Sequence, residues 1–183
     1  MSNEVFARLV DAHYEPLYRF ALSLARNGAD AGDLVQQTFF IWAKKGASLR
    51  ETDKAKSWLF TTLYREFLRA RRRGGRETFI EDLPPGETDI AAEEVDRVAK
   101  LDGATVMVAL QQVDENFRAP LTLFYLEDLA YHEIAEALGV PIGTVMSRLS
   151  RGKAQLRAIL AKQEAGTNTK VVSFPVKQRG KTA

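Results

Sequence analysis

The chain contains 183 residues, of which 45% are hydrophobic and 27% are charged, and its formal net charge is only +2. This composition is typical of a globular protein, and the length suits one large domain or two small ones. The totals alone do not indicate a nucleic-acid-binding protein, so the distribution of charge along the chain matters more. The chain has no cysteine, which excludes a disulfide framework and a thiolate metal site.

Neither a targeting segment nor a membrane span is apparent in the sequence. The N-terminal stretch MSNEVFARLVDAHYEPLYRF is acidic and amphipathic, unlike a secretory signal peptide. No apolar run approaches the roughly 20 residues that a membrane-spanning helix needs. We therefore expect a soluble, cytoplasmic protein without membrane insertion.

Three helical patterns fill the first 76 residues. Apolar residues recur at spacings of three and four over residues 6–24, and the stretch NGADAGD then interrupts the pattern. Asp30 is a candidate N-cap for a second helix that covers residues 33–45. A third helix is predicted from residue 57 to a stop at Gly74-Gly75.

Residues 77–103 differ in composition from the segments on either side. The sequence Pro84-Pro85-Gly86 lies within a run of acidic residues, namely Glu77, Glu81, Asp82, Glu87, Asp89, Glu93, Glu94 and Asp96. A proline pair followed by glycine inside a charged run is typical of a linker.

Four more helical patterns follow over residues 104–165. Pro120 has to lie in the first turn of its helix, which predicts that this helix starts near Asn116. The tail over residues 166–183 has cations but no acid, and we expect it to be disordered. The fold is therefore predicted to be all-α, with small helical domains over residues 1–76 and 104–165 joined by a flexible acidic linker.

The stretch YHEIAEALGVPIGTVMSRL has the layout of a helix-turn-helix. Two helices that cross steeply need a small residue at their contact, a turn residue that tolerates positive φ, and an apolar residue that locks the pair. Ala135, Gly139 and Val145 supply these in order. The apolar inner face is completed by Ile134, Leu138 and Val140.

The second helix of this motif has two different sides. At about 100° per residue, one side carries Val145, Leu149, Gly152, Leu156 and Leu160. The other side carries Thr144, Ser147, Arg148, Arg151 and Gln155. There is no acid from residue 141 to 160, which suits the phosphate-rich edges of a major groove. A helical hairpin with a basic face and no ligand is the alternative.

The third helix of the first domain combines basic and aromatic residues. From Lys54 to Arg76 the only acid among many cations is Glu66. One side carries Leu59, Phe60, Leu63 and Phe67, and the other carries Thr61, Thr62, Arg65, Arg69 and Arg72, with Trp58 at its start. A helix face with basic and aromatic residues suits a single nucleic-acid strand with unstacked bases. Alternatively, Trp58 and Tyr64 are core residues and the arginines form a solubilising end.

The second helix has a mostly polar face with one aromatic residue in it. The face consists of Asp33, Gln36, Gln37, Phe40 and Lys44. A Phe within a polar face is a candidate anchor for a protein contact, although scattered exposed aromatic residues are common.

Taken together, three stretches resemble a known family in the correct order. DAGDLVQQTFFIWAKK resembles the region two signature helix of the extracytoplasmic-function (ECF) subgroup of the sigma-70 family of RNA polymerase sigma factors. SWLFTTLYREFLRARRR resembles the next helix of that family, which recognises the promoter −10 element. FYLEDLAYHEIAEALGVPIGTVMSRLSRGKAQLR resembles region four, whose helix-turn-helix recognises the −35 element. The resemblance covers residues 5–76 and 104–160.

The resemblance implies a partner for each face. The contacts with the clamp helices of the polymerase β′ subunit would come from Asp33, Gln36, Gln37 and Phe40. The melted −10 strand would meet Trp58, Thr61, Arg65, Arg69 and Arg72. The −35 duplex would meet Thr144, Ser147, Arg148, Arg151 and Lys153. The acidic linker would thread the core enzyme, because its charge imitates nucleic acid. Two departures concern DNA reading: Met146 stands where a cation is frequent in the family, and Arg65 where many members carry Asn.

The sequence therefore predicts a promoter-recognition subunit that binds core RNA polymerase, through the β′ clamp helices and the β flap, and helps to open promoter DNA. An anti-sigma partner is a further expectation from the resemblance. The alternative is a stand-alone helix-turn-helix regulator that binds an operator without polymerase. An enzyme is not expected, because the sequence has no glycine-rich phosphate loop, nucleophile elbow or metal-spaced cluster. No cofactor, metal or catalytic residue is predicted.

Overall fold

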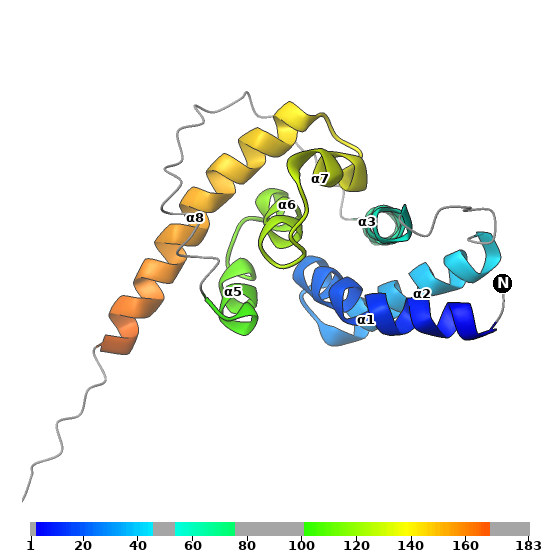
Figure 1. Cartoon of the computed structure of the whole chain (residues 1–183). Coiled ribbons are helices and arrows are strands. Elements are labelled where there is room, and N and C mark those ends of the chain that lie inside the picture. Colours follow the sequence, from blue (N-terminus) through cyan, green and yellow to red (C-terminus); the bar gives the residue numbers. More distant parts are fainter. Residues whose placement is uncertain (1–2, 46–53, 76–100, 169–183) are drawn as a thin grey trace, which may run out of the picture.

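The computed structural model describes residues 3–45, 54–75 and 101–168, and the regular structure in these ranges is helical (Figure 1). The first lobe consists of α1 (Asn3–Ala25), α2 (Gly28–Lys45) and α3 (Ala55–Arg73). The second lobe consists of α5 (Gly103–Leu110), α6 (Glu115–Tyr125), α7 (Tyr131–Leu138) and α8 (Ile142–Asn168). The all-α prediction is confirmed. Across these three ranges, no helix has the length and apolar character to cross a membrane.

In the first lobe, α1, α2 and α3 each bury one face in a shared apolar core. Leu17 and Phe20 of α1 are fully buried, and the Phe20 ring meets Phe60 of α3 edge-on, with 5.5 Å between centroids. The predicted stop of α3 is confirmed, because Gly74 follows the last helical residue and Gly75 adopts a φ of 69°.

The start of α2 differs from the prediction. The helix begins at Gly28, and the backbone N–H of Asp30 donates to the side-chain oxygen of Asn27 at 2.8 Å. This is the usual contact of an N-cap residue, so Asn27 caps the helix and the prediction of Asp30 as cap is wrong. Asn is as good an N-cap as Asp, and residue type alone did not separate the two.

The second lobe contains the predicted helix-turn-helix between α7 and α8. Gly139 adopts the left-handed conformation with a φ of 66°, which glycine reaches without steric cost. The N–H of Val140 donates to the Ala135 carbonyl at 3.1 Å, and Val145 is fully buried. The predicted turn is confirmed.

Two details of the second lobe differ from the prediction: the turn of α6 that holds Pro120 and the end of α8. α6 begins at Glu115, so the predicted start near Asn116 is confirmed, but Pro120 lies in the second turn rather than the first. Because proline has no N–H, Pro120 cannot donate a hydrogen bond to the carbonyl one turn earlier. The helix nevertheless continues past Pro120, because it buries Leu121 and Leu123. α8 extends to Asn168, into the segment that was expected to be a disordered tail.

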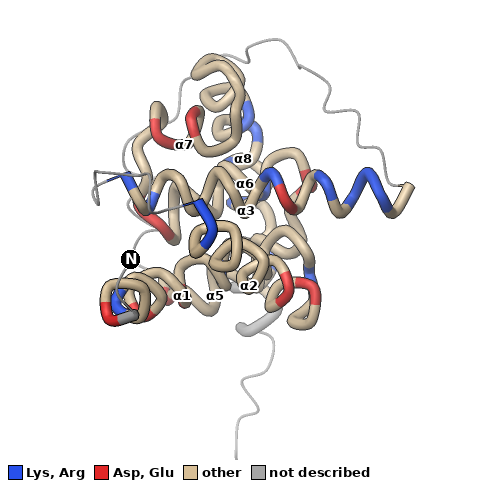
Figure 2. The backbone as a smooth tube through the Cα atoms, turned by 90° about the vertical axis from the view of Figure 1, so that its right-hand side faces the viewer, with Lys and Arg blue, Asp and Glu red and all other residues tan. Residues whose placement is uncertain are grey.

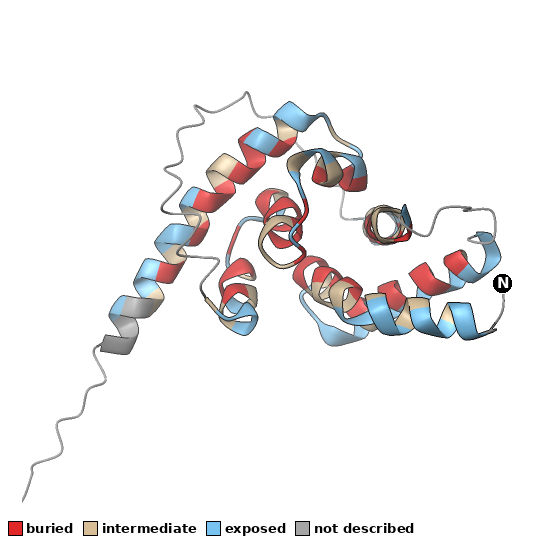
Figure 3. Ribbon diagram, viewed as in Figure 1, coloured by how far each residue is buried: buried red, intermediate tan, exposed pale blue. Residues whose placement is uncertain are grey.

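The two lobes pack directly against each other. α1 contacts α6, and α3 contacts α7, as the view along α3 makes visible (Figure 1). In Figure 3, buried residues gather on the sides of α5, α6 and α8 that face one another. Most of the predicted linker and the tail beyond Asn168 lie outside the described residues.

Candidate nucleic-acid and polymerase interfaces

The face of α3 predicted to meet single-stranded DNA is a continuous line along the helix. Arg65, Arg69 and Arg72 are exposed, and their spacing of four and three places them on one side. Thr61 and Trp58 are half-buried on the same side, about one and two turns before Arg65. Figure 2 shows basic residues along the C-terminal part of α3. The structure therefore brings the five predicted residues together.

Two contacts hold this face in shape. The Trp58 ring meets Trp42 of α2 edge-on, with centroids 5.0 Å apart and an interplanar angle of 75°, so one edge of Trp58 is anchored while the side chain stays partly accessible. Arg69 donates to the carboxylate of Glu66 at 2.6 Å. By contrast, Tyr64 is buried in the core, as the alternative interpretation expected for that residue. Burial also raises the pKa of the Tyr64 hydroxyl.

The predicted polymerase-binding face of α2 is exposed. Asp33, Gln36, Gln37 and Phe40 are all exposed, and Phe40 has 52% of its surface accessible. The Lys44 ammonium lies over the Phe40 ring, 4.1 Å from its centroid. This cation–π contact holds the exposed ring in place.

These four residues also line one wall of a cleft of about 1360 Å³. The C-terminal part of α3 also lines this cleft, and the second lobe contributes Gln112, Val113 and Asp114 from the turn between α5 and α6. The sequence could not indicate this neighbourhood, because it depends on how the lobes pack.

The predicted −35 residues on α8 are divided by the structure. Thr144 and Arg151 are half-buried. Ser147, Arg148 and Lys153 are buried, with exposed fractions of 4%, 5% and 5%, and the Ser147 hydroxyl donates to the Thr144 carbonyl at 3.1 Å. The helical wheel grouped four of these residues on one side, but the neighbouring helices cover a wider part of α8 than its apolar stripe.

Lys153 is held inside the second lobe by aromatic rings. Its ammonium lies 4.0 Å from the centroid of Phe124 and within 6 Å of the rings of Tyr125 and Tyr131. It also donates to the Tyr131 hydroxyl at 3.3 Å. These contacts come from α6 and α7, so Lys153 stabilises the packing of the lobe and is not presented to a duplex here.

Arg148 points towards the first lobe. Its positive charge acts on the Tyr64 hydroxyl of α3, and its buried Nη2 atom has no hydrogen-bond partner in the described part of the chain. The side of α8 that remains open at its start instead carries Ile142 and Met146, which are 50% and 39% exposed.

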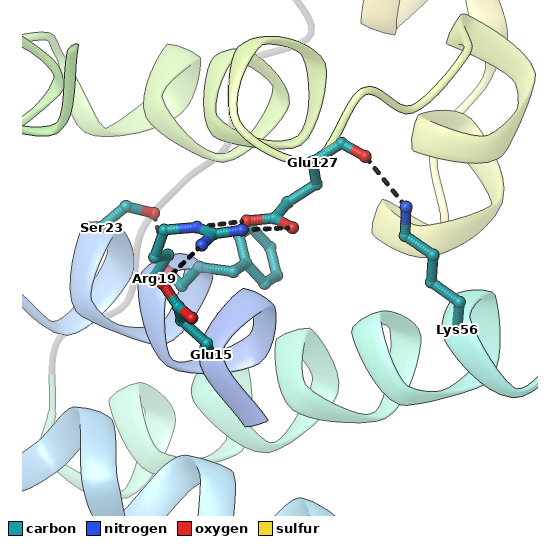
Figure 4. Close-up of polar contacts among 6 residues, drawn as sticks. Glu15, Arg19, Ser23, Lys56 and Glu127 are labelled. Atoms are coloured by element: carbon teal, nitrogen blue, oxygen red, sulfur yellow. Dashed lines mark hydrogen bonds and ion pairs between the residues drawn. The ribbon is translucent and has the colours of Figure 1, made fainter. Parts of the chain in front are cut away.

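A polar network between the lobes was not predicted (Figure 4). Glu127, in the turn between α6 and α7, is 5% exposed. Its carboxylate accepts two hydrogen bonds from the Arg19 guanidinium of α1, at 3.1 and 3.3 Å. The Glu127 carbonyl accepts from the Lys56 ammonium of α3 at 3.0 Å. Burial raises the pKa of the Glu127 carboxyl, and the nearby Arg19 and Lys56 cations oppose that shift.

A second inter-lobe contact involves a buried arginine. Arg118 of α6 donates to the backbone carbonyls of Leu110, Ser23 and Val113 at 3.0, 3.3 and 2.8 Å. Burial lowers the pKa of Arg118 to about 10, so it remains charged near neutral pH. No local sequence pattern distinguishes Arg118 or Glu127 from surface residues, because their partners are distant in the chain.

The geometry defines a class of protein: a helix-turn-helix lobe joined to a second helical lobe that has a basic-aromatic helix and a separate exposed protein-contact face. Models of sigma-70 region 2 and sigma-70 region 4 match residues 9–77 and 104–156. The chain belongs to the ECF subgroup of the sigma-70 family of RNA polymerase sigma factors.

Individual relatives support this assignment. The chain is 37% identical over 164 residues to the ECF sigma factor SigE of Mycolicibacterium smegmatis, covering 87% of this chain and 63% of the relative. It is 30% identical over 159 residues to SigL of Mycobacterium tuberculosis, covering 86% of this chain and 89% of the relative. A solved structure of the Bartonella quintana sigma factor RpoE with the anti-sigma factor NepR matches with a TM-score of 0.65 at 27% identity, covering 86% of this chain and 98% of that chain.

Proposed function

We propose that this protein is a sigma factor that binds core RNA polymerase, directs it to promoters with −35 and −10 elements, and helps to open the DNA. It would act in the cytoplasm and would carry out no chemistry itself. The observation that carries the proposal is the simultaneous presentation of two separate faces in one lobe: the polymerase-binding face of α2 and the basic-aromatic face of α3.

The α2 face would contact the β′ clamp helices through Asp33, Gln36, Gln37 and Phe40. The exposed Phe40 supplies an apolar anchor within a polar rim, which is the usual arrangement of an interface hot spot. The α3 face would hold the unstacked −10 strand, with Arg65, Arg69 and Arg72 facing phosphates. The helix-turn-helix would enter the −35 major groove, with Thr144 and Arg151 as its accessible polar residues.

Regulation by an anti-sigma factor is part of the proposal. The Bartonella quintana relative was solved in complex with such a partner, and the cleft of about 1360 Å³ between the lobes exposes the α2 face to a polypeptide. A partner that occupied this cleft would compete with the polymerase for Phe40.

Transcription from genomic DNA with reconstituted holoenzyme tests the function. The protein and bacterial core polymerase are incubated with a fragment library from the genome that encodes the chain, and 5′ ends are mapped. We expect starts that share a −10 and a −35 motif. If no specific start appears, the proposal fails, and a footprint by the protein alone would support a stand-alone regulator.

A matched pair of variants tests the α2 face. Phe40→Ala should weaken binding to core polymerase by about tenfold or more, as expected for loss of an aromatic hot spot. The control is Val108→Ala, because Val108 is also an exposed apolar residue, at 58%, and lies on α5 of the other lobe. Equal affinities for the two variants in a fluorescence binding assay would remove Phe40 from the interface.

A further inference from the structure

We propose that α8 recognises thymine methyl groups through an apolar edge formed by Ile142 and Met146, and that these residues determine the −35 specificity of this protein. The proposal rests on the proposed function, because it concerns what the helix-turn-helix reads. The proposal assigns a role to Ile142 and Met146, which were not among the polar residues of α8 predicted to contact DNA.

The apolar edge is defined by exposure and spacing. Ile142 and Met146 lie four residues apart, hence on one side of α8, and are 50% and 39% exposed. Their neighbours Val145 and Leu149 are buried at 0% and 1% and fix the helix to its partners. The core therefore sets the rotation of α8 and leaves Ile142 and Met146 exposed. Figure 3 shows that the start of α8 includes exposed positions.

Two of the predicted DNA-binding cations of α8, Arg148 and Lys153, are buried. Lys153 is surrounded by Phe124, Tyr125 and Tyr131, and removing it would break its cation–π contacts and its hydrogen bond. Arg148 is 5% exposed and lies on the side that faces the first lobe. The commonest specific contact in a major groove is an arginine that donates to guanine. The open side of the first two turns of α8 has no arginine that could make this contact.

The position of the edge matches the part of the motif that enters DNA. In helix-turn-helix proteins the N-terminal residues of the second helix contact base edges in the major groove. The distinctive apolar group in that groove is the C5 methyl of thymine. One helical turn rises about 5.4 Å and successive base pairs are about 3.4 Å apart. Ile142 and Met146 can thus reach methyl groups about two base-pair steps apart.

Charge favours duplex DNA over an apolar protein partner for this edge. The helix has no acidic residue from residue 141 to 160, so phosphates on both sides of a groove can approach it without repulsion. Gly143 follows Ile142 directly, and a Cβ atom added there would meet nothing within 4 Å. This open space leaves room for a base edge to come close.

The test uses holoenzyme and a promoter library. The −35 region of a promoter found by start mapping is randomised, open complexes are selected, and the DNA is sequenced for wild type, Ile142→Ala, Met146→Ala and the exposed control Val108→Ala. We expect wild type and the control to enrich thymine at two positions. Each α8 variant should lose the preference at one of them, and Met146→Arg should replace thymine by guanine there.

A chemical substitution isolates the methyl group. Deoxyuridine in place of the selected thymine removes only the methyl and should weaken wild-type complexes about fourfold, the factor that burial of one methyl of about 0.8 kcal/mol implies. The same substitution should have no effect on Met146→Ala at its position. The inference is overturned if wild type does not distinguish thymine from deoxyuridine, or if Met146→Ala and wild type select the same sequences.

These outcomes are separable from those of the proposed function. A holoenzyme that selects promoters but ignores the methyl groups overturns the inference and leaves the sigma-factor function intact. A protein that supports no specific start overturns the function and the inference together. Circular dichroism of the α8 variants should match wild type, because both substituted side chains are exposed.

Discussion

At the scale of single residues, His13 links the stability of the protein to pH. It is half-buried on α1, and its pKa is lowered from 6.5, first by burial and then by the positive charge of Lys56. Below pH 6.5 the unfolded chain therefore takes up this proton more readily than the folded protein. The stability that neutral His13 contributes is present above pH 6.5 and is lost as the pH falls through its lowered folded pKa.

Replacement of His13 should reduce this pH dependence. We expect wild type to lose more stability than His13→Gln between about pH 7.5 and about pH 5.5, because only wild type has to protonate a half-buried imidazole. Urea unfolding at both pH values measures the difference. His132→Gln is the matched control, because His132 is exposed and is the other of the two histidines. If His13→Gln and His132→Gln show the same loss, His13 is not the source.

At the scale of helices, Gly152 sets the distance between α8 and α6. A Cβ atom at this position would lie 2.8 Å from both Leu121 Cδ1 and Phe117 Cβ. The Phe117 Cβ is fixed to its backbone and cannot move aside without shifting the helix. The two helices therefore approach as closely as they do only because residue 152 has no side chain.

Adding one methyl group at each of two glycines of α8 should have opposite effects. Gly152→Ala should destabilise the protein by about 1–3 kcal/mol through overpacking. Gly143→Ala should stabilise it by about 0.5–1 kcal/mol, because alanine favours the helix and a Cβ at Gly143 meets nothing within 4 Å. Denaturant unfolding of the two variants measures both. Equal effects would contradict the close approach at Gly152.

The sequence predicts those features that depend on residues close together in the chain. The turn at Gly139 and the stripe that carries Phe40 follow from spacing within one or two helices, and both were predicted. The side of α8 that faces solvent was not. The aromatic residues that enclose Lys153 come from other helices, and Arg148 is buried with its charge near Tyr64 of the first lobe. A helical wheel separates apolar from polar residues. It does not show which polar residues other helices will bury.

At the scale of the whole molecule, the packing of the lobes follows from contacts between residues far apart in sequence. Arg118 reaches the Ser23 carbonyl across the interface, and Glu127 joins α1 to α3 by accepting from Arg19 and Lys56. In this packing the charge of Arg148 lies near Tyr64 of the first lobe, and the α2 face and the α5–α6 turn line the same cleft. The contacts with polymerase and DNA therefore depend on whether the lobes remain packed.

Reversing one charge in the network should separate the lobes. Arg19→Glu places a carboxylate opposite the buried Glu127, and loss of charge-assisted hydrogen bonds of about 1.5–3 kcal/mol should shift the packed-to-separated ratio by roughly 10- to 100-fold. Because the chain has no cysteine, dyes can be attached to cysteines introduced at the exposed positions Asp11 and Ala158. Energy transfer between the two dyes should fall in Arg19→Glu.

Glu15→Ala is the control, since Glu15 pairs with Arg19 on the same helix and is 82% exposed. The double variant Arg19→Glu with Glu127→Arg should recover part of the transfer. Unchanged transfer in Arg19→Glu would show that the Arg19–Glu127 pair is not needed to keep the lobes packed.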